Sequence, residues 1–230
     1  TWDVPVPDYL SMLTGEIRGL KVGVIQERVD TEAVDPEVRD NVVQAIAVLG
    51  ELGADIQEVS IPLIVHSAAI SNTIILTDAA GVHRQGIDEH LGEYDHNIQI
   101  RLLVGSIIPA QAHQKAVKLR QVLRQQILDA LEKVDVLVMP TSSIPASPIP
   151  TKAGIGSKQE VLDGLAGRRS FTAPFNVANT PALSINCGFT SQQLPVGFQI
   201  AGKPFDEGTL FRVAHAYEQA TDWHTRRPPI

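Results

Sequence analysis

The last third of the chain, from Phe171 to His224, contains the pattern that most restricts the fold. Two short apolar segments bounded by turn residues, Ala182 to Phe189 and Val196 to Ala201, predict buried β-strands joined by a polar return. Asp206 then occupies the position of a helix N-cap, and four apolar residues after it share one helical face: Leu210, Val213, Ala214 and Tyr217. Such a helix buries its apolar face on the sheet, so we expect the earlier elements to pack around this unit.

A second pattern, near the N-terminus, predicts a strand–helix–strand crossover. Leu20 to Ile25 is a β-branched strand, Asp35-Pro36 is a strong helix start, Gly53 ends that helix, and Ile56 to Ile61 alternates like a strand. The short connections between them predict a right-handed crossover and a parallel pair of strands. Residues 26–28, which follow the first strand, include no glycine, so a dinucleotide site is not expected there.

Between these two units the sequence predicts helices and one further strand. Apolar residues at helical spacing predict three helices, at 64–83, 98–105 and 106–133. The polar stretch 85–97 predicts a loop, and Val134 to Met139 predicts the most deeply buried strand of the chain. The fold class that follows is α/β, with helices packed on a mixed sheet.

Hydroxyl-bearing residues follow that buried strand directly, as Thr141, Ser142 and Ser143. Ligands of open α/β sheets gather outside the carboxyl ends of the strands, so Thr141 and Ser142 are candidate substrate-binding residues. No base lies next to them in the sequence to activate a serine, which disfavours a complete active site here. The histidines at 83, 90 and 96 lack the spacing of a zinc site and a cysteine to join them, so no metal is predicted.

The composition excludes several classes of function. A net charge of -7 argues against a broad nucleic-acid-binding surface, which would need a basic face. The single cysteine, Cys187, cannot form an internal disulfide and fits a reducing compartment, so we expect a cytoplasmic protein. In the sequence no apolar run approaches the length of a membrane span, and no membrane association is predicted.

The order of motifs along the chain carries a resemblance to a known family. In the last third the motifs are Pro174-x-Asn176, Pro181-Ala182-Leu183-Ser184, Leu194-Pro195-x-Gly197-x-Gln199 and Phe205-Asp206-Glu207. Together they closely resemble the C-terminal end of amidase-signature hydrolases, and DYLSMLTGEIRGLKVGV, DPEVR and KVDVLVMPTS upstream resemble the same family. The resemblance implies an α/β/α sandwich around a mixed sheet. Residues 1–230 would form the C-terminal portion of this single domain, with residues 1–19 as a lead-in arm.

The resemblance also implies a chemistry and shows what the chain lacks for it. Amidase-signature enzymes cleave amide C–N bonds with a serine nucleophile, a second serine in a cis peptide and a lysine, and they need no cofactor. The Gly/Ser-rich stretch that holds those serines is not found here, and Thr141 to Ser143 has no flanking glycines to form an oxyanion cradle. We therefore expect no catalytic residue in the chain. We interpret it as the C-terminal half of an amidase whose catalytic half precedes Thr1.

Two arginines become candidate substrate-binding residues through the resemblance. Arg101, in QIRLLVGS, matches an arginine of the glutamyl-tRNA amidotransferase members that binds the substrate glutamine. A guanidinium can hold a carboxylate through two hydrogen bonds, and the alternative is a surface arginine that pairs locally. Arg169 matches an aspartate of those members that holds the amino group of glutamine, and an arginine there would repel an ammonium. The resemblance thus implies an amide bearing an anionic group in place of glutamine, which leaves a tRNA-dependent role open.

Two functions remain open on the sequence. One is half of an amide hydrolase that acts on a small-molecule amide and needs its N-terminal half or a partner chain. The other is a non-catalytic binding or assembly module on an amidase-like scaffold, which pairs with a partner or with itself. A bare apolar sheet face would favour the first, because the other half should dock there.

Overall fold

The computed structural model describes residues 3–149 and 171–227 in full and the backbone of residues 169 and 170. Its described strands form one five-stranded sheet in the order β2-β1-β3-β5-β4. Their bounds are β1 Lys21–Ile25, β2 Asp55–Val59, β3 Val136–Pro140, β4 Ala182–Phe189 and β5 Pro195–Gly202. β1 is parallel to β2 and β3, whereas β5 is antiparallel to β3 and β4. The sheet is therefore mixed, and the two predicted units join where β3 pairs with β5.

The predicted crossover between β1 and β2 is confirmed. It contains the short helix α1 (Gln26–Val29) and the longer helix α2 (Pro36–Glu51). The Asp35 carboxylate accepts hydrogen bonds from the backbone amides of Glu37, at 2.9 Å, and Val38, at 3.4 Å. Asp35 is thus the N-cap and Pro36 takes the first helical position, where its missing N–H costs nothing.

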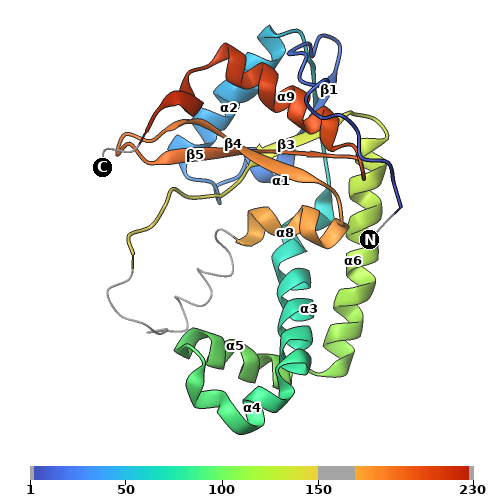
Figure 1. The fold of residues 1–230 in the computed structure, drawn as a ribbon, viewed down its shortest axis with the longest axis vertical. Helices are drawn as coiled ribbons and strands as arrows, with labels where there is room; N and C mark the ends of the chain where they lie inside the picture. Colours follow the sequence, from blue (N-terminus) through green and yellow to red (C-terminus); the bar gives the residue numbers. More distant parts are fainter. Residues whose placement is uncertain (1–2, 150–168, 228–230) are drawn as a thin grey trace.

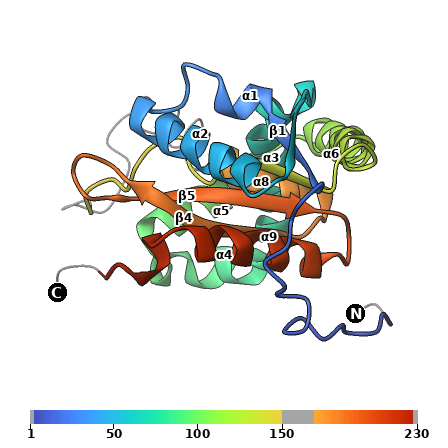
Figure 2. The same ribbon diagram turned by 90° about the horizontal axis from the view of Figure 1, so that it is seen from above.

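Helices α2 and α9 (Glu207–Ala220) lie side by side over one face of the sheet (Figure 2). The four residues predicted to share the inner face of α9 are all buried. Tyr217 is one of them, and its ring centroid lies 6.2 Å from that of Phe198 on β5. Asp206 does occupy the N-cap position, but its carboxylate accepts from the Thr209 hydroxyl instead of a backbone amide.

The opposite face of the sheet is covered by α8 (Arg169–Ala178) together with the sheet-proximal ends of α3 (Ser67–Val82) and α6 (Ala110–Leu131) (Figure 1). The last two helices extend away from the sheet and carry a small helical lobe at their far end, formed by α4 (Arg84–His90) and α5 (His96–Ile107). Three short 3-10 helices complete the described elements: η1 (Pro62–His66), η2 (Leu91–Glu93) and η3 (Trp223–Thr225). The chain therefore has the predicted α/β/α layers.

Two sequence predictions about the helical lobe were wrong. The stretch 85–97, predicted as a loop, contains α4 and η2, because polar pairs at helical spacing stabilise it: Arg84 with Asp88 and Gln85 with Glu89. The long helix predicted from Ser106 begins only at Ala110, since Pro109 forces the residue before it into an extended conformation.

Two arginines of α6 hold the C-terminal end of α8. The Arg120 guanidinium donates to the Val177 carbonyl at 3.0 Å and to Asn179 Oδ1 at 3.1 Å, and Arg124 donates to the Ala178 carbonyl. Cationic side chains at this end of a helix satisfy its unpaired carbonyls and its dipole. Asn179 has a φ of 53°, the left-handed geometry that asparagine tolerates in such a turn.

One segment, Pro62–Val82, is long and apolar enough to cross a membrane by length and composition, with a mean hydropathy of 1.3. The expectation that no apolar run approaches span length was therefore wrong. A third of the segment is buried within the structure, where α3 packs against α5, α6 and α8. Core helices of soluble proteins meet the same criterion, so the segment alone does not indicate a membrane.

Candidate functional site

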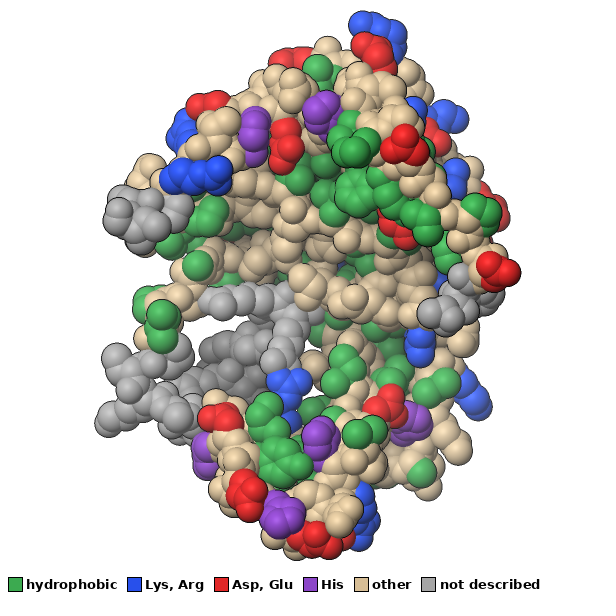
Figure 3. All heavy atoms as spheres, viewed as in Figure 1, with side chains coloured by type: hydrophobic (Ala, Val, Ile, Leu, Met, Phe, Trp, Pro, Cys, Tyr) green, Lys and Arg blue, Asp and Glu red, His purple; other side chains and the backbone are tan. Residues whose placement is uncertain are grey.

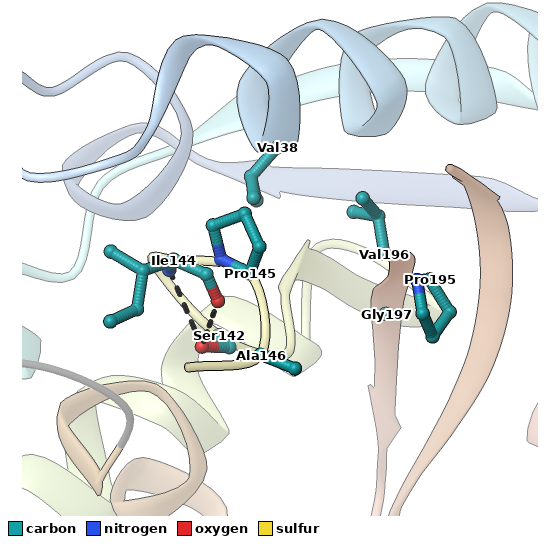
Figure 4. A pocket seen from close by; sticks show the side chains of 8 residues that line it. All are labelled: Val38, Ser142, Ile144, Pro145, Ala146, Pro195, Val196 and Gly197. Atoms are coloured by element: carbon teal, nitrogen blue, oxygen red, sulfur yellow. Dashed lines mark hydrogen bonds between the residues drawn. The ribbon is translucent and has the colours of Figure 1, made fainter. Parts of the chain in front are cut away.

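The carboxyl ends of four strands lie at the same edge of the sheet. β1, β2 and β3 are parallel, and β4 runs with β3 because both are antiparallel to β5. A cavity of about 240 Å³ opens at this edge (Figure 4). Its lining comes from the start of α2, the loop after β3 and the start of β5: Val38, Ser142, Ile144, Pro145, Ala146, Pro195, Val196 and Gly197. The edge predicted to bind ligands is therefore hollowed.

Ser142 lines this cavity, but its hydroxyl is engaged within its own loop. It donates to the Ile144 carbonyl at 2.7 Å and accepts from the Ile144 amide at 3.3 Å (Figure 4). The next residue, Ser143, is buried, and its carbonyl accepts from the Asp35 amide at 2.8 Å. These bonds fix the loop to the start of α2, so Ser142 shapes the cavity and has no partner that could activate it as a nucleophile among its described contacts.

Thr141 follows the end of β3, and its side chain contacts a residue on the α8 side of the sheet that the sequence prediction missed. Its Oγ1 is 2.6 Å from Ser184 Oγ on β4, and its amide donates to the Gly197 carbonyl at 2.9 Å. The signal for Ser184 was present in the sequence: Ala182 and Ser184 alternate with Leu183 and Ile185, which puts the small residues on one face of the strand. What the sequence did not reveal was that Thr141 stands beside it.

The return between β4 and β5 is bound to the start of α2, which forms one wall of the cavity. The Glu37 carboxylate accepts from the Ser191 amide and, at 2.8 Å, from the Ser191 hydroxyl. The amide hydrogen bond and then the hydroxyl hydrogen bond lower the pKa of Glu37 below its ordinary value of 4.5. The ionised carboxylate is therefore the form that holds the return in place.

We expect this contact to make stability depend on pH. The folded-state pKa of Glu37 is lowered. The contribution of this contact to the stability of the fold is therefore complete above pH 4.5 and is lost as the pH falls through the folded-state pKa. Thermal unfolding of wild type and Glu37→Gln from neutral pH to about pH 3 should show a difference in melting temperature that shrinks in the acid range. Glu32→Gln, at an exposed position before α2, is the control. A difference that stays constant across the range would contradict this role.

The two predicted arginines lie on other elements. Arg101 is half-buried on α5, in the lobe at the end of α3 remote from the sheet (Figure 1). Arg169 is the first residue of α8, and its side chain lies outside the described part of the structure. Figure 3 shows the α4–α5 lobe projecting below the body that contains the sheet. The described structure thus brings Thr141 and Ser142 to one strand end and places Arg101 on the lobe.

Other reactive side chains have structural surroundings. Burial raises the pKa of the Cys187 thiol to about 12, so it is not a nucleophile near neutral pH. His83 contacts the Tyr94 hydroxyl at 3.2 Å, and His90 lies 3.1 Å from Glu93. Within residues 3–149 and 171–227 no three His, Cys, Asp or Glu side chains form a group that could hold a metal ion.

The sequence matches the model of one protein family over most of its length. The family model described as Amidase matches residues 1–211, so the chain belongs to the amidase family. The resemblance inferred from the motifs is thereby confirmed.

Particular relatives are subunits of glutamyl-tRNA(Gln) amidotransferases. The subunit from Halalkalibacterium halodurans is 34% identical over 252 residues, which cover 99% of this chain and 50% of the relative. That from Gloeobacter violaceus is 36% identical over 254 residues, with the same coverage. The chain thus spans about half the length of the curated relatives it matches.

Solved structures confirm the fold class. The glutamyl-tRNA(Gln) amidotransferase subunit from Thermotoga maritima superposes with a TM-score of 0.76 at 28% identity, covering 96% of this chain and 46% of that one. A bacterial aryl acylamidase of the amidase-signature family gives a TM-score of 0.81 at 19% identity, covering 99% and 50%. The second likeness shows the shared fold alone.

Proposed function

We propose that the chain is the C-terminal half of an amidase that hydrolyses a carboxamide C–N bond. The observation that carries this proposal is the family match, which takes in 99% of the chain but only half of each relative. The catalytic serines and lysine would come from the remaining half. The chain itself would complete the sheet and one side of the substrate pocket, in the cytoplasm, where its single thiol stays reduced.

An incompletely covered surface supports the need for further protein. β4 is the last strand of the described sheet, and a strand edge is a template for pairing with another chain segment. On its α8 side Ala182 and Ser184 are exposed, whereas Leu183 and Ile185 on the α9 side pack against the core. Large apolar side chains are also exposed on α3 and α5: Ile75, Val82, Leu103 and Ile107. The bare part of the sheet thus carries small residues instead of the apolar face expected from the sequence. The exposed large apolar residues lie on α3 and on α5, in the lobe remote from the sheet.

We propose an amide with an anionic group as the substrate. Arg101 and Arg169 are the residues that support this choice, since a guanidinium binds a carboxylate through two charge-assisted hydrogen bonds. In the glutamyl-tRNA amidotransferase members that the motifs resemble, the substrate glutamine carries an ammonium beside its carboxylate. Arg169 argues against that ammonium, so we propose that free glutamine is a poor substrate.

Ammonia release from a matched pair of amides tests the proposal. The whole protein should hydrolyse succinamate, which bears a carboxylate, better than butanamide, its neutral analogue. Residues 1–230 alone should release no ammonia from either. Arg101→Ala should raise the KM for succinamate by about tenfold or more and leave the KM for butanamide unchanged. Arg39→Ala, at an exposed arginine of α2, is the control.

Two results would reject parts of this function. If the whole protein releases no ammonia from a panel of these amides, glutamine and benzamide, amide hydrolysis is wrong and a binding module on the amidase scaffold remains. If glutamine is the best substrate, the assignment of an anionic amide is wrong although amide hydrolysis stands.

A further inference from the structure

The contact between Thr141 and Ser184 joins two strands that are not neighbours. β5 lies between β3 and β4, yet the two hydroxyl oxygens are 2.6 Å apart across it. The register explains which face they share: Ser184 is paired with Gln199, and paired residues of antiparallel strands point to the same side. The Gln199 amide donates to the Phe171 carbonyl of α8 at 3.2 Å. The hydroxyls therefore lie on the α8 side of the sheet, where Ser184 is exposed.

Gly197 on β5 makes this contact possible. A Cβ at this position would lie 2.9 Å from Thr141 Cβ and Oγ1 and 3.0 Å from Ser184 Oγ. Any side chain would therefore separate the two hydroxyls. A glycine inside a strand weakens the strand, and it commonly marks a place where a ligand or another backbone comes close.

One of the two hydroxyl protons of the pair is not used in the hydrogen bond between them. Two hydroxyls carry two protons, and their mutual bond uses one of them. Within the described residues neither side chain has another hydrogen-bond partner. A hydroxyl that already accepts a hydrogen bond is a stronger donor, because chained hydrogen bonds polarise one another. The pair thus offers one strengthened O–H to an acceptor on the exposed face.

We propose that Thr141 and Ser184 form a substrate-binding site for an oxygen acceptor on the part of the amide that is not cleaved. The inference rests on the proposed function and deepens it, because it adds a neutral donor to the arginines for the same anionic substrates. Ser184 is the new residue of the site. Gly197 positions the pair because it has no side chain that would separate the two hydroxyls.

Kinetics of the whole protein on the same amide pair test the site. Ser184→Ala and Thr141→Val each remove one hydroxyl, so each should raise the KM for succinamate about tenfold, with the KM for butanamide unchanged and kcat on both within about twofold. Ser184→Thr keeps a hydroxyl and should retain most of the affinity. Gly197→Ala should act like the hydroxyl deletions, because its Cβ separates the pair. Ser11→Ala, on the N-terminal arm, is the control.

The alternatives give different results. Equal KM values for wild type and Ser184→Ala, or equal rises for both amides, would overturn the site. A lower melting temperature of the hydroxyl deletions without a change in either KM would also overturn it, because the pair would then stabilise the fold without binding the substrate. If wild type hydrolyses glutamine or benzamide but neither of these amides, this site is wrong although amide hydrolysis stands. If it hydrolyses none of the four, the proposed function fails and this inference fails with it.

Discussion

Replacing Phe171 by alanine is expected to lower the free energy of unfolding by about 4 kcal/mol. The ring is 1% exposed, and the Arg28 guanidinium lies over it at 4.6 Å from the ring centroid. Arg28 itself donates to the Ile64 carbonyl and to Ser67 Oγ, so it joins α1, α8 and the start of α3. Desolvation by burial lowers the pKa of Arg28 to about 10, which still leaves it charged at neutral pH. The substitution therefore removes a core ring and uncovers a buried cation. Urea unfolding measures the loss.

A double-mutant cycle separates these two effects. Phe171→Ala and Arg28→Met should show a coupling energy of about 1–2 kcal/mol, since a desolvated cation over an aromatic ring is attracted by it. Phe175 is the matched control: it is also buried on α8, and among the described rings Phe171 is the one that Arg28 covers. Phe175→Ala should destabilise without coupling to Arg28. Equal coupling for the two phenylalanines would show that Arg28 acts through general packing.

Gly105→Ala is expected to displace α5 from α3 and to cost about 3 kcal/mol. A Cβ at Gly105 would lie 2.0 Å from the Leu76 carbonyl oxygen and 2.7 Å from its carbonyl carbon. These are backbone atoms of a helix and cannot turn aside like a side chain, so the lobe has to move. Because Arg101 lies one turn earlier on α5, the KM for succinamate should rise as well. Hydrogen exchange of the α5 amides measures the displacement directly.

Gly81→Ala is the matched control for this substitution. Gly81 lies near the end of α3, and a Cβ there would meet nothing within 4 Å. Alanine is a better helix former than glycine, so this variant should be neutral or more stable by up to about 1 kcal/mol. If both variants leave the exchange of α5 unchanged, the close approach at Gly105 does not fix the lobe.

Elements with strong local signals were predicted correctly. The strand at Val136–Pro140 follows from an unbroken apolar run, and helix α2 follows from Asp35 and Pro36 at its start. The hairpin follows from two short apolar segments bounded by turn residues, and α9 follows from an apolar period of 3.6 residues. The lobe was predicted less well, because α4 is stabilised by polar pairs that leave no apolar period to detect.

The candidate site likewise has features that the sequence predicted and features that only the tertiary structure shows. The sequence by itself determined the family, the α/β class and the hydroxyl residues after β3, because each depends on residues close together in the chain. Only the tertiary structure decided that Ser142 is engaged within its own loop, that Thr141 meets Ser184, and that Arg28 lies buried over Phe171. The physical reason is that these contacts join residues on separate elements. The pairing of the strands, the space left at Gly197 and the packing of α8 fix them, and no local pattern encodes such distances.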